Sequence, residues 1–349
     1  MRLNKNNKYY QDDLDYVIGV KGIDSLKGKS ILITGATGMV GLCLIDALMK
    51  FNDKENPGIN VFAVGRDRNK ASERFGDYYS NPMFHFIEQD VRNPFPEDLS
   101  VDYIIPLASN THPLAYSKYP VETVEINVKG AENALKKAVQ CGAVILYPST
   151  VEVYGNGEGP FDENYTGKLN LSTSRACYTE SKRVSEALCQ SYIAEYGVDC
   201  KIVRLSRLFG PTMLGSDTKA SSQFILKALA GEDIVLKSKG DQFFSYTYVA
   251  DAVQAILFVM LNGECGQAYN IACDSCNVHL AVFAKECASL AGRSVVFDIP
   301  SEIESRGYSV ASKAILATNK LSSLGWTSCR SFKEAVGRTY SILQDLNNS

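Results

Sequence analysis

The chain has 349 residues, of which 45% are hydrophobic, so it is long enough to bury a large core. Its 36 lysines and arginines nearly balance 39 aspartates and glutamates, and the formal net charge of -3 leaves no basic field for binding nucleic acid. No segment approaches the roughly 18 uninterrupted apolar residues of a membrane span, and the first residues lack the apolar stretch of a secretion signal, so we expect a cytoplasmic protein without nucleic-acid or membrane partners.

The ten cysteines are scattered along the chain, which favours reduced and mostly buried thiols over disulfides. Cys273 and Cys276 form a C-x-x-C pair, with Cys265 nearby. A zinc site would need further ligands at suitable spacing, and the three histidines stand far apart in sequence, at His85, His112 and His279. We therefore expect no metal site.

The residues before about 28 form a polar arm, in which LDYVIGV (14–20) is a short amphipathic piece that we expect to dock on the body. Beyond the arm, apolar β-branched runs alternate with helical patterns, which is typical of a parallel sheet with helices on both faces. The expected strands are 30–35, 59–65, 84–90, 101–108, 143–149 and 200–206, and helical patterns between them include 40–51, 121–140 and 178–196.

The first expected strand runs directly into TGATGMVG, which spaces three glycines as G-x-x-G-x-x-G ahead of a helix. Glycines at this point let the backbone approach a pyrophosphate closely, while the helix N-terminus supplies free N–H groups and a positive dipole end. A tight turn that serves packing alone is the alternative. The residues expected to contact a dinucleotide here are Gly35, Thr37, Gly38, Met39, Val40 and Gly41.

The end of the second strand bears on the choice of cofactor. Gly65 stands where a fold that holds NAD usually has a carboxylate for the ribose hydroxyls, and Arg66, Asp67 and Arg68 follow it. Guanidinium groups at this point favour the 2′-phosphate of NADP, so we lean to NADP. NAD stays open, because Asp67 is still able to reach the ribose and exposed arginines also serve solubility.

The end of the third strand carries QDVRN, with Asp90 and Val91 at the point where the strand stops. A carboxylate there is able to accept a hydrogen bond from an adenine amino group. Asp90 is equally suited to an ordinary turn at a strand end.

The segment RACYTESKR sets Tyr178 and Lys182 four residues apart, one helical turn along the same face. The pKa of a free tyrosine is about 10, and a cation one turn away is expected to stabilise the phenolate and lower that pKa. The segment YPSTVEVYG adds Thr150, beside Ser149, as a hydroxyl donor near a substrate oxygen. Such a set suits removal of a proton from a hydroxyl while a hydride leaves the adjacent carbon for a nicotinamide. For the pair alone, an ordinary i,i+4 surface contact is the alternative.

After about residue 210 the alternation gives way to loops, short helices and a few strands, which indicates a smaller lobe. We therefore predict an α/β fold, a Rossmann-type doubly wound parallel sheet with a smaller C-terminal substrate-binding lobe. The expected divisions are an N-terminal arm (1–27), a dinucleotide-binding domain (28–209) and a mainly substrate-binding lobe (210–349), from which 248–262 returns to the dinucleotide-binding domain.

Together these motifs resemble the extended short-chain dehydrogenase/reductase family, and within it the nucleotide-sugar epimerases, dehydratases and decarboxylases. The resemblance covers roughly residues 28–340. It rests on TGATGMVG, DV after the third strand, LAS at 107–109, EINVKG, STVEVYG, YTESK, RLFGP and YVADAV. Within the family, RACYTESKR looks most like the UDP-glucuronate decarboxylase and dTDP-glucose 4,6-dehydratase branch.

The resemblance implies a role for each motif residue. Tyr178 would be the base, Lys182 its electrostatic partner and a nicotinamide-ribose ligand, Thr150 the hydroxyl donor and Asn127 the helix residue that supports the site. It also implies a homodimer formed by the helices at 121–140 and 178–196, whose apolar stripes equally suit the core. The further residues expected to contact the cofactor are Arg66, Asp67, Arg68, Asp90, Val91, Leu107, Ala108, Ser109, Asn127, Tyr178 and Lys182.

One departure from the family concerns proton transfer. The dehydratases carry Thr-Asp-Glu at the site, whereas this chain reads Thr150-Val151-Glu152. Valine cannot donate a proton, so ordinary 4,6-dehydration is disfavoured. Glu152 remains available for proton transfer or for orienting the substrate, or it bonds the backbone at the strand end.

A second departure concerns the diphosphate. Relatives usually place an arginine ahead of the Y-V-x-D segment and tend to have asparagine in the R-x-x-N-x-F-G-P motif, whereas this chain has Phe244 and Arg207 at those points. We expect Arg207, with Lys219, Arg306 or Lys313, to restore the positive charge, although solvated surface charges and a substrate without a nucleotide are alternatives. The residues expected to contact the substrate are Ser149, Thr150, Arg207, Lys219, Phe244 and Arg306.

The expected function is NAD(P)-dependent modification of a nucleotide-activated sugar through a transient ketone at carbon 4, as an epimerase, decarboxylase or related enzyme. One alternative is a net reductase or dehydrogenase of a sugar or small alcohol that exchanges its cofactor at every turnover. Another is a protein that binds the cofactor without catalysis. The intact set of Thr150, Tyr178 and Lys182 argues against the last alternative.

Overall fold

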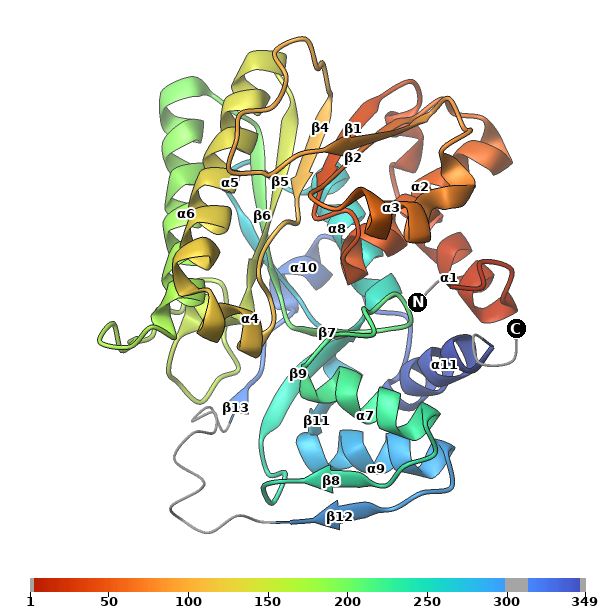
Figure 1. The fold of residues 1–349 in the computed structure, drawn as a ribbon. Helices are drawn as coiled ribbons and strands as arrows, with labels where there is room; N and C mark the ends of the chain where they lie inside the picture. The colour runs from red at the N-terminus through yellow and green to blue at the C-terminus, as the bar shows by residue number, and fades with distance from the viewer. Residues whose placement is uncertain (1–2, 299–312, 346–349) are drawn as a thin grey trace.

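The computed structural model describes residues 3–298 and 313–345, which form two stacked lobes (Figure 1). The larger lobe contains a seven-stranded sheet in the order β10-β6-β5-β4-β1-β2-β3, and every neighbouring pair is parallel. The six strands that the sequence predicts are present, and β10 adds a seventh at one edge. The strands are β1 (Ser30–Thr34), β2 (Asn60–Gly65), β3 (Phe84–Glu88), β4 (Tyr103–Pro106), β5 (Val144–Thr150), β6 (Cys200–Leu205) and β10 (Ala268–Ile271).

Both faces of this sheet are buried, which explains why its strands are almost continuously apolar. In β1, Ile31 and Ile33 belong to the cluster on the side of α2 and α8, whereas Leu32 belongs to the cluster on the side of α5 and α6. The alternation follows from the period of two along a strand. The covering helices are α2 (Met39–Glu55), α5 (Pro120–Cys141), α6 (Ala176–Tyr196) and α8 (Val249–Asn262).

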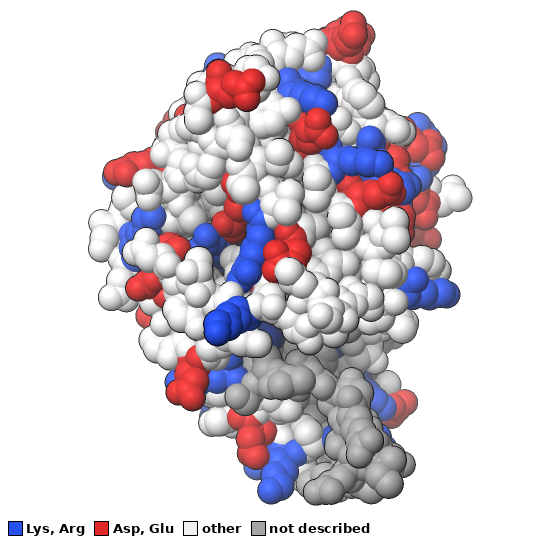
Figure 2. Space-filling view, turned by 90° about the vertical axis from the view of Figure 1, so that its left-hand side faces the viewer, with Lys and Arg blue, Asp and Glu red and all other residues white. Residues whose placement is uncertain are grey.

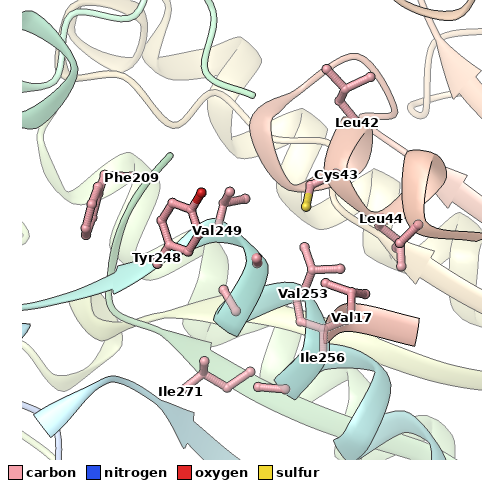
Figure 3. Close-up of a cluster of buried hydrophobic side chains, with 14 of the residues drawn as sticks. Val17, Leu42, Cys43, Leu44, Phe209, Tyr248, Val249, Val253, Ile256 and Ile271 are labelled. Atoms are coloured by element: carbon pink, nitrogen blue, oxygen red, sulfur yellow. The ribbon is translucent and has the colours of Figure 1, made fainter. Parts of the chain in front are cut away.

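The core between α8, α2 and the N-terminal arm is drawn in Figure 3. Val249, Val253 and Ile256 of α8 are fully buried, and Cys43 of α2 and Val17 of the arm lie on the same side. The arm forms α1 (Lys8–Ile18), which packs against α2 and α8. The docking expected for the amphipathic piece of the arm is therefore confirmed.

The smaller lobe is formed after residue 206. Strand β9 is its centre and pairs with β7, β11 and β13, while β8 and β12 form a separate pair. The strands are β7 (Arg207–Phe209), β8 (Ile234–Leu236), β9 (Phe243–Tyr248), β11 (Asn277–His279), β12 (Val295–Phe297) and β13 (Lys313–Ala314). The remaining described helices, which are divided between the two lobes, are α3 (Arg68–Phe75), α4 (Pro113–Lys118), α7 (Ala220–Leu229), α9 (Leu280–Leu290), α10 (Asn319–Ser323) and α11 (Phe332–Gln344).

Within residues 3–298 and 313–345, the 3-10 helices are η1 (Ile23–Leu26), η2 (Gly76–Tyr78), η3 (Val151–Tyr154) and η4 (Asp274–Cys276). Among the described helices none is long and apolar enough to cross a membrane. On the face drawn in Figure 2, basic and acidic side chains are interspersed, as the nearly balanced charge of the sequence predicts.

Candidate active site

The glycine-rich turn lies between β1 and α2, at the carboxyl edge of the parallel sheet. Gly35 has a φ of 62°, and a β-carbon there would lie 2.7 Å from the backbone nitrogen of Ala108. A β-carbon on Gly41 would lie 2.5 Å from the carbonyl oxygen of Ala36. Gly38 precedes the first turn of α2, and no side chain caps that turn. The turn therefore has the close backbone approach and the open helix N-terminus that a pyrophosphate site needs.

The charged residues after β2 are each bonded to a partner elsewhere in the protein. Arg66 Nη1 lies 2.6 Å from Glu122, and Arg68 Nε lies 2.9 Å from Glu88. The carboxylate of Asp67 caps α3 by accepting an N–H of its first turn. The structure thus holds two guanidinium groups beside the end of β2, where Asp67 is already occupied as a cap.

Asp90 and Val91 lie just beyond β3, as the sequence predicts. The side chain of Arg92 donates to both oxygens of Asp90, at 3.0 and 2.7 Å, and this bond holds the pKa of Asp90 below its ordinary value. Val91 is buried, and a β-carbon on Gly130 of α5 would come within 3.1 Å of its side chain. Both residues are therefore fixed in place at this end of the sheet.

The segment Leu107–Ser109 follows β4 and is tied to two helices through Asn127. Ser109 Oγ donates to Asn127 Oδ1 at 2.7 Å, and Asn127 Nδ2 donates to Ser181 Oγ of α6 at 2.8 Å. Asn127 is 2% exposed, so these bonds satisfy an amide that is shielded from water. Asn127 is in this structure a positioning residue that connects the loop after β4 to the helix carrying Tyr178.

Thr150 and Tyr178 meet where β5 ends and α6 begins. Thr150 is the last residue of β5, and its side chain lies close enough to Tyr178 to act on the pKa of the phenol. Burial raises the pKa of Tyr178 above its ordinary value, and the neighbouring side chain of Thr150 opposes this shift. Ser149 is also buried, and its Oγ has no hydrogen-bond partner among the described residues. The structure thus brings together the hydroxyl groups of Thr150 and Tyr178, as the sequence predicts.

Lys182 lies one turn along α6 from Tyr178 but turns its ammonium group elsewhere. Its Nζ donates to the carbonyl of Pro148 at 2.8 Å and lies 4.9 Å from the centre of the Tyr147 ring. Burial lowers the pKa of Lys182 to about 8. The expected lowering of the Tyr178 pKa by Lys182 is therefore wrong for this structure, because burial dominates the phenol and the ammonium is bonded to a backbone carbonyl.

Tyr116 and Arg175 complete this region, and neither was predicted from the sequence as a site residue. Tyr116 of α4 stacks on Tyr178, with ring centres 5.5 Å apart, and the guanidinium of Arg175 lies 4.4 Å from the Tyr116 ring. Arg175 also forms an ion pair with Glu152 at 3.1 Å. Arg175 stands within the quoted RACY segment, whereas Tyr116 has no motif that would have revealed it. Glu152 is thus held beside the tyrosines by a cation.

Several of the second-lobe residues that are expected to bind the substrate are in contact with other residues of the protein. Arg207 of β7 stacks on Phe244 of β9, with 3.6 Å between the guanidinium carbon and the ring centre. Lys219 pairs with Asp217 at 3.1 Å, and Lys313 lies in β13 opposite Phe243. Arg306 lies outside the described residues.

The loop between β7 and α7, residues 210–219, reaches back to the larger lobe. Arg74 of α3 donates to the carbonyls of Thr212 and Met213 at 3.1 and 3.0 Å. The hydroxyl of Thr212 donates to the carbonyl of Met39 at 2.8 Å. Because Met39 begins α2, this loop is fastened to the glycine-rich turn.

The far end of the same loop is held by Asp217. His112, which precedes α4, has its Nδ1 3.0 Å from Asp217 Oδ1, and Lys219 bonds the other oxygen. Burial acts to raise the pKa of Asp217, but the bond with His112 and the charge of Lys219 together hold it below its ordinary value. Lys219 therefore helps to hold the 210–219 loop in place, and this loop connects the two lobes.

Comparison with known proteins identifies the family. The model of the NAD dependent epimerase/dehydratase family matches residues 31–272, which is more than half of the chain. The chain belongs to this family. The matched residues include the glycine-rich turn, Thr150, Tyr178, Lys182 and the second-lobe strand β9.

Among its curated relatives, UDP-glucuronic acid decarboxylase 1 of Xenopus tropicalis is 37% identical over 242 residues, or 69% of this chain and 56% of that protein. UDP-glucuronic acid decarboxylase 6 of Arabidopsis thaliana is 34% identical over 265 residues, or 75% of this chain and 70% of that protein. The aligned region thus spans only about half of the Xenopus protein.

Solved structures of the epimerase/dehydratase family share the fold. The UDP-glucuronic acid 4-epimerase of Bacillus cereus, solved with UDP-glucuronic acid and NAD, superposes with a TM-score of 0.77 at 20% identity, covering 91% of this chain and 99% of that one. The UDP-glucose 4-epimerase of Thermotoga maritima, solved with UDP-glucose, gives 0.76 at 22% identity with the same coverage. These likenesses confirm the predicted Rossmann-type architecture.

Proposed function

We propose that this protein modifies a nucleotide-activated sugar with NAD or NADP, through a transient ketone at carbon 4 of the sugar. The observation that carries the proposal is the placement of Thr150, Tyr178 and buried Lys182 at the carboxyl edge of a parallel sheet that also carries the glycine-rich turn. Membership of the epimerase/dehydratase family and the names of the decarboxylase relatives support it.

In the proposed reaction, Tyr178 removes the proton of the hydroxyl on carbon 4, and Thr150 orients that hydroxyl. A bound nicotinamide would supply the hydride chemistry at the same carbon. The raised pKa of Tyr178 means that the phenol is protonated in the resting structure at neutral pH, so the approach of positive charge is required before it serves as a base. Arg175 already acts in this direction on the Tyr178 pKa, and Lys182, one turn along α6, would add to it if its ammonium left the carbonyl of Pro148.

We propose Glu152 as the group for any proton transfer other than the one at the hydroxyl on carbon 4. It lies two residues beyond Thr150, and its backbone N–H donates to Thr150 Oγ1 at 3.3 Å. Val151 offers no acid for expulsion of a hydroxyl, so we propose epimerisation or decarboxylation in preference to 4,6-dehydration. The ion pair with Arg175 keeps Glu152 on the side of Tyr116 and Tyr178.

For the cofactor, we propose a preference for NADP over NAD. Arg66 and Arg68 flank the end of β2, both side chains are about half exposed, and the carboxylate of Asp67 is used in capping α3. A 2′-phosphate would draw the two guanidinium groups away from Glu122 and Glu88, since phosphate carries more charge than a carboxylate. Titration of the protein with both cofactors tests this preference, and Arg66→Ala should reduce NADP affinity more than NAD affinity.

We also propose a homodimer through α5 and α6. Both helices expose apolar side chains, including Val121 and Val124 of α5 and Val184 and Tyr196 of α6. An unpartnered monomer would leave this surface in water, whereas a second copy would cover it. Light scattering on the wild type and on Val184→Asp measures the assembly, with a dimer expected only for the wild type.

The proposed base is tested by Tyr178→Phe. This change removes only the phenolic oxygen, so the ring still stacks on Tyr116 and the fold is retained. We expect turnover of a nucleotide sugar to be abolished while the dissociation constant of the cofactor stays within about threefold, because a single neutral hydrogen bond contributes little net free energy. Retained turnover in this variant would overturn the assignment of the base.

A further inference from the structure

Arg207 is partly buried, and its guanidinium, unlike those of the other shielded arginines, has neither an ion pair nor a hydrogen bond among the residues that the structure describes. Arg204 is paired with both oxygens of Glu186, Arg330 is paired with Asp13, and Arg74 donates to two carbonyls. Arg207 Nη1 is shielded from solvent without a hydrogen-bond partner, and no carboxylate forms an ion pair with this guanidinium anywhere in residues 3–298 and 313–345. An unpaired charge in such a place is costly unless a ligand completes it.

The guanidinium of Arg207 is nevertheless held in a defined position. It lies 3.6 Å from the centre of the Phe244 ring, and the register of β7 with β9 places Arg207 opposite Tyr246. Stacking on an aromatic face fixes the plane of the guanidinium and leaves its edge available for two parallel hydrogen bonds. A carboxylate or a phosphate group matches that edge.

The surroundings of Arg207 are those of the catalytic tyrosine. Glu152, Tyr116 and Arg175 act electrostatically on both Arg207 and Tyr178. Glu152 is already paired with Arg175 at 3.1 Å, so its negative charge is largely neutralised by Arg175. Two guanidinium groups against one carboxylate leave a positive charge beside the reacting sugar, which suits an anionic substituent on the substrate.

We propose that Arg207, held by Phe244, binds an oxyanion of the substrate and so determines which substrates are accepted. The inference rests on the proposed function, because the substrate is taken from it. Two groups of a nucleotide sugar offer the same chemistry, namely a carboxylate on the sugar ring and the diphosphate. The neighbours that Arg207 shares with Tyr178 favour the ring carboxylate over the diphosphate that we expect from the family pattern.

The test is a titration by calorimetry of the cofactor-loaded protein with UDP-glucuronate, UDP-glucose and UDP. The variants are Arg207→Gln, which removes the charge, and Arg207→Lys, which keeps the charge without the planar fork. Arg293→Ala, at an exposed arginine of the second lobe, is the matched control. Circular dichroism and cofactor affinity establish that each variant is folded.

A ring carboxylate at Arg207 predicts that Arg207→Gln weakens UDP-glucuronate binding about 10- to 100-fold and leaves UDP-glucose and UDP unchanged, as expected for loss of hydrogen bonds to a charged group. A diphosphate at Arg207 predicts equal weakening for all three ligands. Arg207→Lys should fall between the wild type and Arg207→Gln in either case, and Arg293→Ala should bind as the wild type does. Unchanged binding of all three ligands by Arg207→Gln would overturn the proposal.

Failure of the proposed function gives a different result. If the wild type binds none of the three ligands, glucuronate and pyrophosphate are compared separately as stabilisers against heat, with sodium chloride at equal ionic strength as the reference. Stabilisation of the wild type that is lost in Arg207→Gln supports an oxyanion site without a UDP-sugar activity. Equal stabilisation of the two proteins, or none in either, rejects the oxyanion site itself.

Discussion

Replacing Lys182 with methionine should abolish turnover and leave the fold at least as stable as the wild type at pH 7. Lys182 is 4% exposed, and burial lowers its pKa from 10.5 to about 8. Between these two values the unfolded chain binds a proton that the folded chain does not, so stability rises with pH across this window. The shift corresponds to a cost of about 3 kcal/mol at pH 7, where both states are protonated, and about 1.5 kcal/mol at pH 9.5.

Methionine removes this cost but leaves the carbonyl of Pro148 without its donor, which costs about 1–3 kcal/mol. At pH 7 the variant should therefore be about as stable as the wild type or up to about 2 kcal/mol more stable. The unpaired carbonyl does not titrate, so the difference between the two proteins should shift by about 2 kcal/mol in favour of the wild type between pH 7 and 9.5.

Urea denaturation followed by circular dichroism at several pH values measures this difference. Lys227→Met, at a lysine of α7 whose side chain is 40% exposed, is the control and should show little change with pH. A stability difference between Lys182→Met and the wild type that stays constant from pH 7 to 9.5 would refute the argument from burial.

Three further changes probe the parts of the fold that we propose to hold the cofactor. Arg74→Ala removes both bonds to the 210–219 loop, which is fastened to the glycine-rich turn and which we expect to help retain the cofactor. Each bond to a charged donor contributes about 1.5–3 kcal/mol, so stopped-flow measurements should show cofactor dissociation at least about tenfold faster. An unchanged rate would contradict this expectation. Gly41→Ala places a β-carbon 2.5 Å from a carbonyl oxygen and should weaken cofactor binding at least about tenfold in a fluorescence titration, whereas Gly76→Ala, which has open space, should not. Asn127→Leu leaves two serines without their partner and should destabilise the fold by about 1–3 kcal/mol in urea, a loss that Asn127→Asp should partly restore.

The parallel sheet was open to prediction because its strands are buried on both faces and therefore read as apolar runs. Strand β10 was not predicted, because its four residues, Ala268–Ile271, come after the second lobe has begun. Only the packing of α8 brings them back beside β6. A short strand placed by such long-range packing carries no local pattern strong enough to predict it.

The site shows the same division between local and long-range information. The positions of Thr150 and Tyr178 follow from motifs on elements whose ends meet at one edge of the sheet. The direction of the Tyr178 pKa shift does not follow from the spacing, because it depends on burial and on the carbonyl of Pro148 that takes the Lys182 ammonium. Tyr116 and Arg175 likewise meet only through the docking of α4.

The most direct test of the proposed function follows a deuterium label on carbon 4 of UDP-glucuronate and a panel of other UDP-, dTDP-, CDP- and GDP-sugars. Each sugar is incubated with the wild type or with Tyr178→Phe in the presence of NAD or NADP. The masses of the products are then measured by mass spectrometry. The proposed function predicts an isomer or a loss of carbon dioxide in the wild type alone, with the deuterium retained and no net reduction of the cofactor. A product two mass units from its substrate after allowance for the label, formed with stoichiometric consumption of cofactor, would contradict the transient ketone and identify a net oxidoreductase.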